Sequence, residues 1–269
     1  MIGVILPTLA DELHARILAA IEARLRAVGY SVAVTVAEKG QAAALTSRLL
    51  SLGVEGLISI GCCRSTDSRA LAHGRRTPWV AVVSDPDPLQ QNTVGIDFLR
   101  AAETVSRYLH GLGHRRFALL AGAATGAALW DDRRPALQRA LSALPQTSLI
   151  EAPVGNTGAV TEAVHRLLRQ SAPPTAIVCT DDVNAAAAID ACTSFGVAVP
   201  NDVSVTGFGD SELARQWRPA LTTLRFALDE AGKHAAEQLL ALIAGRPSGA
   251  TASAARLIVR RSSGPPPAR

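Results

Sequence analysis

The sequence predicts an α/β protein with two parallel-sheet lobes. Short strands rich in β-branched residues alternate with alanine- and leucine-rich helical stretches along nearly the whole 269-residue chain, which is the βαβ pattern. The alternation runs once through the first hundred or so residues and then restarts, so it indicates two consecutive lobes. Hydrophobic residues make up 48% of the chain, enough for each lobe to bury a core of its own.

The first series of elements begins at the N-terminus and follows from hydrophobic periodicity. We expect strands at 2–6, 31–36, 56–60, 79–83 and 93–96, helices at 11–28, 40–52 and 99–112, and a polar segment after the third strand. One face of the first helix carries Ile17, Leu18, Ile21, Leu25 and Val28, and Gly29 follows as a C-terminal stop.

The second series repeats the alternation. We expect strands at 117–122, 148–153, 176–180 and 203–208, and helices around 132–144, 157–170 and 183–195. The stretch 245–254 is rich in glycine, serine and alanine and predicts a loop or short linker before a last strand at 255–261. The proline-rich end, 264–269, predicts a disordered tail.

Composition argues for a cytoplasmic protein without membrane contact. The net charge of +4 comes almost wholly from arginine, and it is too small and too scattered to indicate nucleic-acid binding by itself. The N-terminal residues lack the basic and long apolar regions of a signal peptide, and no apolar run approaches a membrane span. The four cysteines have no C-x-x-C spacing, which fits a reducing compartment.

Common catalytic and cofactor motifs are missing from the sequence. No G-x-G-x-x-G follows the first strand, and no G-x-x-x-x-G-K-[ST], G-x-S-x-G or H-E-x-x-H occurs. The six histidines do not stand at metal-ligand spacing from cysteines or carboxylates. We therefore expect no cofactor and no metal site.

Polar residues near predicted helix starts are candidate ligand contacts, because helix starts after parallel strands face the crevice of an open α/β sheet. Asp131 and Asp132 stand at one helix start, and Asp181 and Asp182 stand at another. Helix capping is the favoured interpretation of both pairs, and ligand contact is the alternative.

Three further features allow two interpretations each. Arg133 is either a surface guanidinium or a bidentate fork for a carboxylate, a phosphate or vicinal hydroxyls, with Trp130 as a stacking face. Asp210 stands at the tip of a glycine-flanked turn without an obvious catalytic partner. Cys62 and Cys63 are more simply small loop residues than a redox sensor.

Five stretches of the sequence follow the pattern of one known family. They are IEARLRAVGYSVAV at 21–34, VGID at 94–97, LHGLGHRRFALLAG at 109–122, VPNDVSVTGFGDSELARQWRPALTTLRFALDEAGKHAAEQLLALIAG at 199–245 and ARLIVRRSS at 255–263. In this order, across essentially the full chain, they resemble the effector-binding domain of the LacI/GalR family of bacterial transcriptional repressors. The P-A-L-T-T and L-G-H-R-R segments are its most specific parts.

The resemblance implies a periplasmic-binding-protein-like fold of type I, in which two Rossmann-like lobes with parallel sheets are joined by three crossovers. On the family pattern, the chain crosses near residues 113, 223 and 250. The N-terminal lobe would then comprise 1–113 and 223–249, and the C-terminal lobe 114–222 and 250–263, with the tail at 264–269.

The resemblance also implies a non-enzymatic sensor. Members of this family bind a small effector in the cleft between the lobes, and lobe closure alters operator affinity in a homodimer. The family places a helix-turn-helix headpiece before the first strand, whereas this sequence starts at that strand. We therefore expect operator DNA to be bound through a headpiece that is not in this chain.

The effector contacts can be carried over from the family position by position. In the first lobe they fall at Leu13, His14, Cys62 and Asp97, and in the second lobe at Arg133, near Asp181 and in the turn 209–210. Phe98 and Trp130 would add apolar or stacking contact.

The sequence departs from the family pattern at two of these places. The family's G-[FY]-D-D reads Gly207-Phe208-Gly209-Asp210, which lacks the first carboxylate, and its I-D-N ends in Phe98 instead of an amide. Lost polar contacts argue against a typical sugar, because an unpaired buried hydroxyl costs about 1–3 kcal/mol.

Two other function classes stay open. A solute-binding protein of a transport system would share the architecture, although the missing signal peptide speaks against it. An enzyme could use Asp181 or Asp210 with His14, but no nucleophile–base pair is recognisable from spacing.

Overall fold

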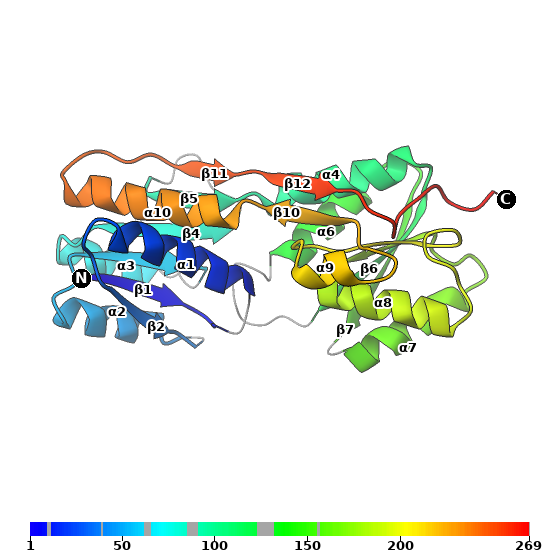
Figure 1. Ribbon diagram of the computed structural model, residues 1–269, viewed down its shortest axis with the longest axis horizontal. Helices are drawn as coiled ribbons and strands as arrows, with labels where there is room; N and C mark the ends of the chain where they lie inside the picture. The colour runs from blue at the N-terminus through cyan, green and yellow to red at the C-terminus, as the bar shows by residue number, and fades with distance from the viewer. Residues whose placement is uncertain are drawn as a thin grey trace. The chain divides into compact units, whose positions relative to one another are not determined.

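The chain folds into two compact units, each built on a parallel sheet (Figure 1). Unit 1 comprises Met1–Asp97, Ala124–Asp132 and Ala227–Ala254, and unit 2 comprises Phe98–Ala123, Arg133–Phe226 and Ala255–Arg269. The structure is a computed structural model that describes residues 1–9, 12–38, 40–61, 66–84, 91–122, 132–154 and 157–268. The predicted α/β class with parallel sheets is confirmed.

Unit 1 contains a six-stranded parallel sheet with the order β11-β5-β4-β3-β1-β2. Its strands are β1 (Ile2–Leu6), β2 (Val32–Val36), β3 (Gly56–Ile60), β4 (Trp79–Ser84), β5 (Thr93–Ile96) and β11 (Thr251–Ser253). Its helices are α1 (Glu12–Arg26), α2 (Ala42–Ser51), α3 (Thr66–Gly74) and α10 (Leu228–Ile243). Helix α1 packs against α10, and α2 packs against α3.

Unit 2 contains a four-stranded parallel sheet with the order β7-β6-β8-β9 and an antiparallel pair, β10-β12. Its strands are β6 (Arg116–Gly122), β7 (Ser148–Val154), β8 (Ala176–Cys179), β9 (Ser204–Thr206), β10 (Thr223–Phe226) and β12 (Ala255–Ile258). Its helices are α4 (Phe98–Gly111), α6 (Arg133–Ser142), α7 (Thr157–Leu168), α8 (Asp182–Ser194) and α9 (Glu212–Gln216).

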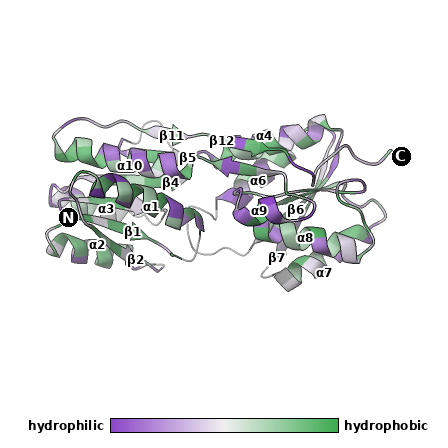
Figure 2. Ribbon diagram, viewed as in Figure 1, coloured by the Kyte–Doolittle hydropathy of each residue, from purple (hydrophilic) through white to green (hydrophobic). Residues whose placement is uncertain are grey.

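Hydrophobic strands form the centre of each unit. Every residue of β1, β3, β5 and β8 is buried, as parallel strands with both faces covered require. Figure 2 shows hydrophobic residues along these sheets and interleaved with hydrophilic residues on the surrounding helices. Within the described part of the chain, no helix combines the length and the apolarity that a membrane span requires.

Most predicted elements are present, α9, β10 and α10 lie where no element is predicted, and three further details differ. The polar segment after β3 contains helix α3, and the predicted linker at 245–254 contains β11, which pairs with β5. Helix α1 buries Ile17, Ile21 and Leu25 as predicted, but Val28 is 47% exposed, because the helix ends at Arg26. Gly29 ends the segment in a left-handed conformation (φ +86°), which confirms the predicted stop.

The units divide the chain at other residues than the sequence predicts. Helix α4 packs on α6 and β12, so it belongs to unit 2, and β10 joins it there through pairing with β12. The chain passes between units at Asp97/Phe98, Phe226/Ala227 and Ala254/Ala255 instead of near 113, 223 and 250, and two further boundaries, Ala123/Ala124 and Asp132/Arg133, are not predicted from the sequence. The physical reason is that a segment belongs to the unit on which it packs, which local sequence does not reveal.

Gly264, the first residue of the predicted disordered tail, is attached to unit 2 by hydrogen bonds. Buried His114 donates from Nε2 to the Gly264 carbonyl oxygen (2.9 Å), and the Gly264 N–H donates to the Ser204 hydroxyl (3.0 Å). The other ring nitrogen of His114 is 2.9 Å from the Thr175 hydroxyl, and burial lowers the pKa of this histidine. A neutral imidazole therefore holds Gly264 in place.

Two buried cysteines in unit 2 are expected to be chemically inert. Cys179 on β8 and Cys192 on α8 have no exposed surface, and burial raises the pKa of the Cys192 thiol to about 12 and also raises that of Cys179. Iodoacetamide at pH 8 should leave both unmodified in the folded protein and alkylate both after unfolding in guanidinium, as measured by peptide mass spectrometry. Equal labelling before and after unfolding would contradict this expectation.

Candidate ligand-binding site

The candidate site lies in unit 2, where parallel strands end and helices begin. Gly122 ends β6 and Cys179 ends β8, while α8 begins at Asp182, with two residues between it and the end of β8. The carboxyl ends of parallel strands are the usual ligand-binding edge of an open α/β sheet, because loops and helix N-termini meet there. The residues that follow these strands therefore form the candidate site.

Asp181 caps helix α8, which confirms the interpretation favoured from the sequence. Its backbone is extended (φ −156°, ψ 166°), and one carboxylate oxygen accepts from the Asn184 N–H at 2.7 Å. The other oxygen accepts from the Asn184 side-chain amide at 2.6 Å. These bonds fix the orientation of the carboxylate, and ligand contact by Asp181 stays a prediction.

Arg133 lies next to this cap. Its guanidinium donates to the Thr180 carbonyl oxygen at 2.8 Å, and its central carbon lies 6.0 Å from the centre of the Phe208 ring. The Thr180 hydroxyl accepts from the N–H of Gly122 at 3.0 Å, so the ends of β6 and β8 are joined at this point. A guanidinium and a carboxylate thus occupy neighbouring places at one edge of the sheet.

Asp182 anchors the turn after β9. Its carboxylate accepts from the Ser211 N–H (2.7 Å), the Ser211 hydroxyl (2.9 Å) and the Thr223 hydroxyl (2.6 Å). Burial raises the pKa of the Asp182 carboxyl, although these hydrogen bonds partly oppose the shift. A Cβ atom on Gly207 would lie 2.2 Å from this carboxylate, so only glycine fits there.

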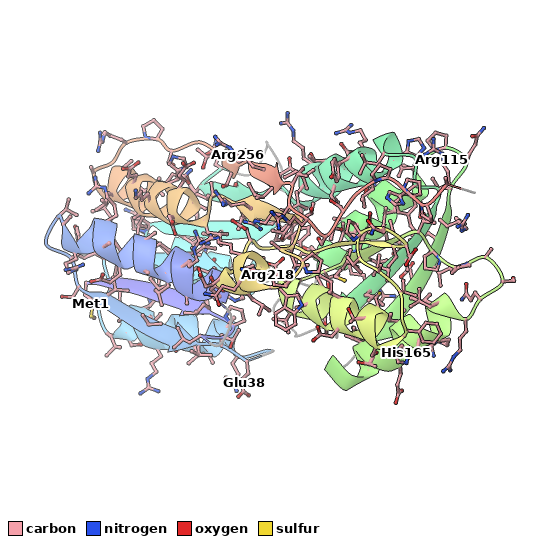
Figure 3. The ribbon with its side chains drawn as sticks, turned by 45° about the vertical axis from the view of Figure 1, so that its right-hand side comes forward. Met1, Glu38, Arg115, His165, Arg218 and Arg256 are labelled. Carbon is pink, nitrogen blue, oxygen red and sulfur yellow. The ribbon has the colours of Figure 1, made fainter. Side chains whose placement is uncertain are left out.

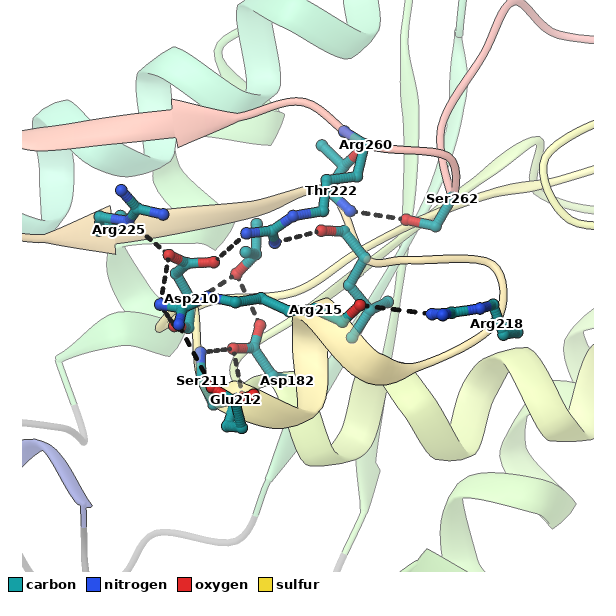
Figure 4. A network of polar contacts seen from close by, with 12 residues as sticks. Asp182, Asp210, Ser211, Glu212, Arg215, Arg218, Thr222, Arg225, Arg260 and Ser262 are labelled. Atoms are coloured by element: carbon teal, nitrogen blue, oxygen red, sulfur yellow. Dashed lines mark hydrogen bonds and ion pairs between the residues drawn. The ribbon is translucent and has the colours of Figure 1, made fainter.

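Asp210 is surrounded by guanidinium groups (Figure 4). Its side chain is 1% exposed and pairs with Arg225, with Arg260 at 2.5 Å and with Arg215 at 3.4 Å. Burial alone would raise the pKa of the Asp210 carboxyl, but the hydrogen bonds and charges of Arg260 and Arg225 outweigh it and hold the pKa below its ordinary value. A ligand would have to compete with these ion pairs for Asp210, and its predicted ligand contact stays a prediction.

A side chain caps the C-terminus of the short helix α9, which follows this turn. The guanidinium of Arg218, which is labelled in Figure 3, donates to the carbonyl oxygens of Gln216 (2.7 Å) and Trp217 (2.9 Å). Arginine in this place satisfies carbonyl groups that a helix end leaves without partners. The C-terminal end of α9 is therefore capped by hydrogen bonds from a residue of the same segment.

Phe98 lies in a cluster of three aromatic rings. Its centre is 5.7 Å from that of Phe208 and 5.3 Å from that of Phe226, and the latter two rings are 4.9 Å apart. All three side chains are essentially buried. Ligand contact by Phe98 stays a prediction, and it would require this cluster to open.

The other predicted contacts lie in unit 1 or outside the described residues. Leu13 and His14 are buried in the first turn of α1, and Asp97 is the partly buried residue after β5. Cys62 and Trp130 lie outside the described residues. Among the residues that the structure does describe, no cluster of three or more histidine, cysteine or acidic side chains could hold a metal ion.

Sequence reasoning missed several residues of this region. Thr180 and Asn184 support Arg133 and Asp181, and the spacing of Asn184 three residues after a capping aspartate could have indicated it. Arg225 and Arg260 lie 15 and 50 residues from Asp210, and no local pattern connects them.

Known proteins resemble this chain over nearly its full length. A family model described as the periplasmic binding protein-like domain matches residues 106–263. The chain is 28% identical to the HTH-type transcriptional repressor PurR of Glaesserella parasuis, covering 89% of this chain and 72% of that protein. A dimeric Lac repressor with a C-terminal deletion matches with a TM-score of 0.85 at 26% identity, covering 99% of this chain and 100% of that chain.

The description of a second similar structure names the molecules bound to it. The Lac repressor dimer bound to operator and the anti-inducer ONPF matches with a TM-score of 0.83 at 25% identity, covering 98% of this chain and 93% of that chain. These similarities confirm the predicted fold, and the relatives are regulators rather than enzymes or transport proteins.

Proposed function

The chain belongs to the periplasmic binding protein-like family, as the effector-binding domain of a LacI/GalR-type transcriptional regulator, and on that premise we propose which effector it binds and how. The effector is a small anionic or polyhydroxyl metabolite that binds at the carboxyl ends of the unit 2 strands. Arg133 and Asp181 are its principal contacts, and the protein acts by binding rather than by catalysis.

One observation carries this proposal: the Arg133 guanidinium lies 2.8 Å from the Thr180 carbonyl oxygen, directly before the capping Asp181. A guanidinium binds carboxylates, phosphates and vicinal hydroxyls in two-point geometry, and a carboxylate accepts from hydroxyl or amino groups. The buried Phe208 ring lies beside the guanidinium and limits where it can move.

The turn after β9 makes an anionic effector the better fit of the two classes. Gly209 stands where the family pattern has a carboxylate, so the turn offers one acceptor fewer for hydroxyl groups. The remaining carboxylate of the turn, Asp210, is engaged by arginine side chains. Contacts by Leu13, His14, Cys62, Asp97, Phe98, Trp130 and Asp210 belong to the proposal as secondary contributions.

We also propose a homodimer that binds operator DNA through a headpiece and works in the cytoplasm. The Lac repressor relative is described as a dimer bound to operator, which supports this assembly. Val34 and Val36 on the edge strand β2 are 43% and 42% exposed, which offers an apolar surface for a second copy.

Effector binding is tested by removing the guanidinium. Thermal unfolding is first followed with a panel of sugar acids, sugar phosphates, free sugars and nucleosides, and a bound effector raises the melting temperature. For the compound that does so, Arg133→Ala should weaken the affinity at least tenfold in calorimetry while the protein without effector melts as the wild type does.

The neighbouring residue on the same helix is the matched control for this experiment. Arg134 is exposed and pairs with Glu151 at 3.0 Å, so Arg134→Ala should leave the effector affinity unchanged. Equal affinity of the wild type and Arg133→Ala would remove Arg133 from the site.

A further inference from the structure

We propose that Asp210 and Arg260 are positioning residues of the effector site: their ion pair holds the turn Gly207–Asp210 on β10 and the end of the β12 segment, and the turn holds Phe208 against Arg133. This inference rests on the proposed function, because it explains how the effector-binding guanidinium is kept in place. This role does not depend on contact between either residue and the effector.

The ion pairs of Asp210 with Arg260, Arg215 and Arg225 have a buried centre. Asp210 is 1% exposed and Arg260 is 16% exposed, while Arg215 and Arg225 are each about half exposed. The Arg260 guanidinium also donates to the Leu221 carbonyl oxygen at 2.8 Å. Buried ion pairs add little net stability, because desolvation opposes the attraction, so their contribution is better sought in the geometry that they impose.

The backbone of the turn Gly207–Asp210 has an unusual conformation. Gly209 (φ +134°) and Asp210 (φ +54°) are both in the left-handed half of conformational space, which a non-glycine residue rarely adopts. The Gly207 and Gly209 N–H groups donate to the Thr222 and Leu224 carbonyl oxygens at 2.9 and 2.8 Å. The ion pairs of Asp210 therefore hold an unfavourable backbone conformation against β10.

Phe208 connects the turn to Arg133. Phe208 lies between the two glycines, so its ring follows the turn, and the Arg133 guanidinium lies 6.0 Å from the ring centre. The same ring contacts Phe98 and Phe226. A shift of the turn would therefore move the surface against which Arg133 lies.

The partners of the turn lie close to unit boundaries in the sequence. Phe98 is the first residue of unit 2 after Asp97, Phe226 is the last before Ala227, and β12 begins at Ala255, where the chain returns to unit 2. The turn next to the proposed effector contact is thus attached to residues or segments near three of the unit boundaries.

The test reads the position of Arg133 without any effector. Asp210→Asn removes the negative charge, and Arg260→Lys keeps the positive charge but loses the second donor group, which binds the Leu221 carbonyl oxygen. In ¹⁵N NMR of the whole chain, Asp210→Asn should shift the Arg133 Nε–H resonance, assigned by its loss in Arg133→Lys, and Arg260→Lys should give a smaller shift in the same direction. Hydrogen exchange of the Gly207 and Gly209 amides should become at least tenfold faster in Asp210→Asn.

Internal controls separate positioning from general stability. The Arg134 Nε–H resonance and the amides of β6 should stay as in the wild type, and so should every signal of Arg133 in Glu151→Gln, which removes an exposed ion pair of the same unit. No change at Arg133 and in the turn would overturn the proposal, and so would faster exchange throughout unit 2 in proportion to lost stability. If Asp210→Asn does not fold, Arg260→Lys decides between the same outcomes. Because no effector is used, a failure of the proposed effector site leaves these results interpretable.

Discussion

Replacing Gly207 by alanine is expected to destabilise the protein by about 3 kcal/mol, since the new methyl group would overlap a buried carboxylate. The Cβ atom would lie 2.2 Å from Asp182 Oδ1, an oxygen that accepts the Thr223 hydroxyl at 2.6 Å. The Asp182 backbone, 3.3 Å from the same point, leaves little room for the side chain to retreat. Moving Asp182 would break the hydrogen bonds that attach α8 to Ser211 and β10, and an unsatisfied buried group adds about 1–3 kcal/mol.

Urea unfolding followed by circular dichroism measures this loss. Gly111→Ala is the matched control, because a Cβ atom at the end of α4 meets nothing within 4 Å, and we expect a change within about 0.5 kcal/mol. A midpoint for Gly207→Ala equal to that of the wild type, with an unchanged slope, would show that Asp182 can move without cost.

Phe98→Ala should cost about 3–5 kcal/mol, the range for deleting a large buried aromatic side chain. Phe98 has no exposed surface, and its ring meets Phe226 edge-on (79°) and Phe208 at a tilt (52°). Alanine would leave a cavity lined by two rings and would remove their aromatic contacts. Thermal or urea unfolding should show the loss in the protein without any effector.

Two further variants serve as controls for the stability of Phe98→Ala. Phe98→Leu keeps much of the apolar volume and should lose clearly less stability, whereas Val183→Ala, at a residue 54% exposed on α8, should lose almost none. A Phe98→Ala protein as stable as the wild type would show that the ring is not a core residue. It would then favour the role in effector contact that the sequence predicts.

The positions of most strands and helices could be predicted from the sequence, because periodicity and turn residues act over a few residues. The strands at 2–6, 56–60 and 117–122 and the stop at Gly29 illustrate this. Five elements escaped prediction: helices α3, α9 and α10 and strands β10 and β11. Helix α3 lies in a polar segment, and β11 has only three residues, Thr251–Ser253, paired with a distant strand.

The crossing points and the surroundings of the turn could not be predicted in the same way. Helix α4 has an ordinary amphipathic pattern, and only its packing on α6 and β12 assigns it to unit 2. Asp210 looked like a tip available to a ligand, but arginines 15 and 50 residues away surround it. Which side chains neutralise a buried charge depends on contacts between distant segments, and these contacts leave no trace in local patterns.

By itself, the sequence determined the α/β class, the order of most elements, the cap at Asp181 and the family to which the chain belongs. Only the tertiary structure decided which segments share a unit, why Gly207 must be glycine and which guanidinium groups hold Asp210. The physical reason is one of range: backbone sterics and hydrophobic periodicity are properties of neighbouring residues, whereas close packing and charge pairing join residues that folding alone brings together.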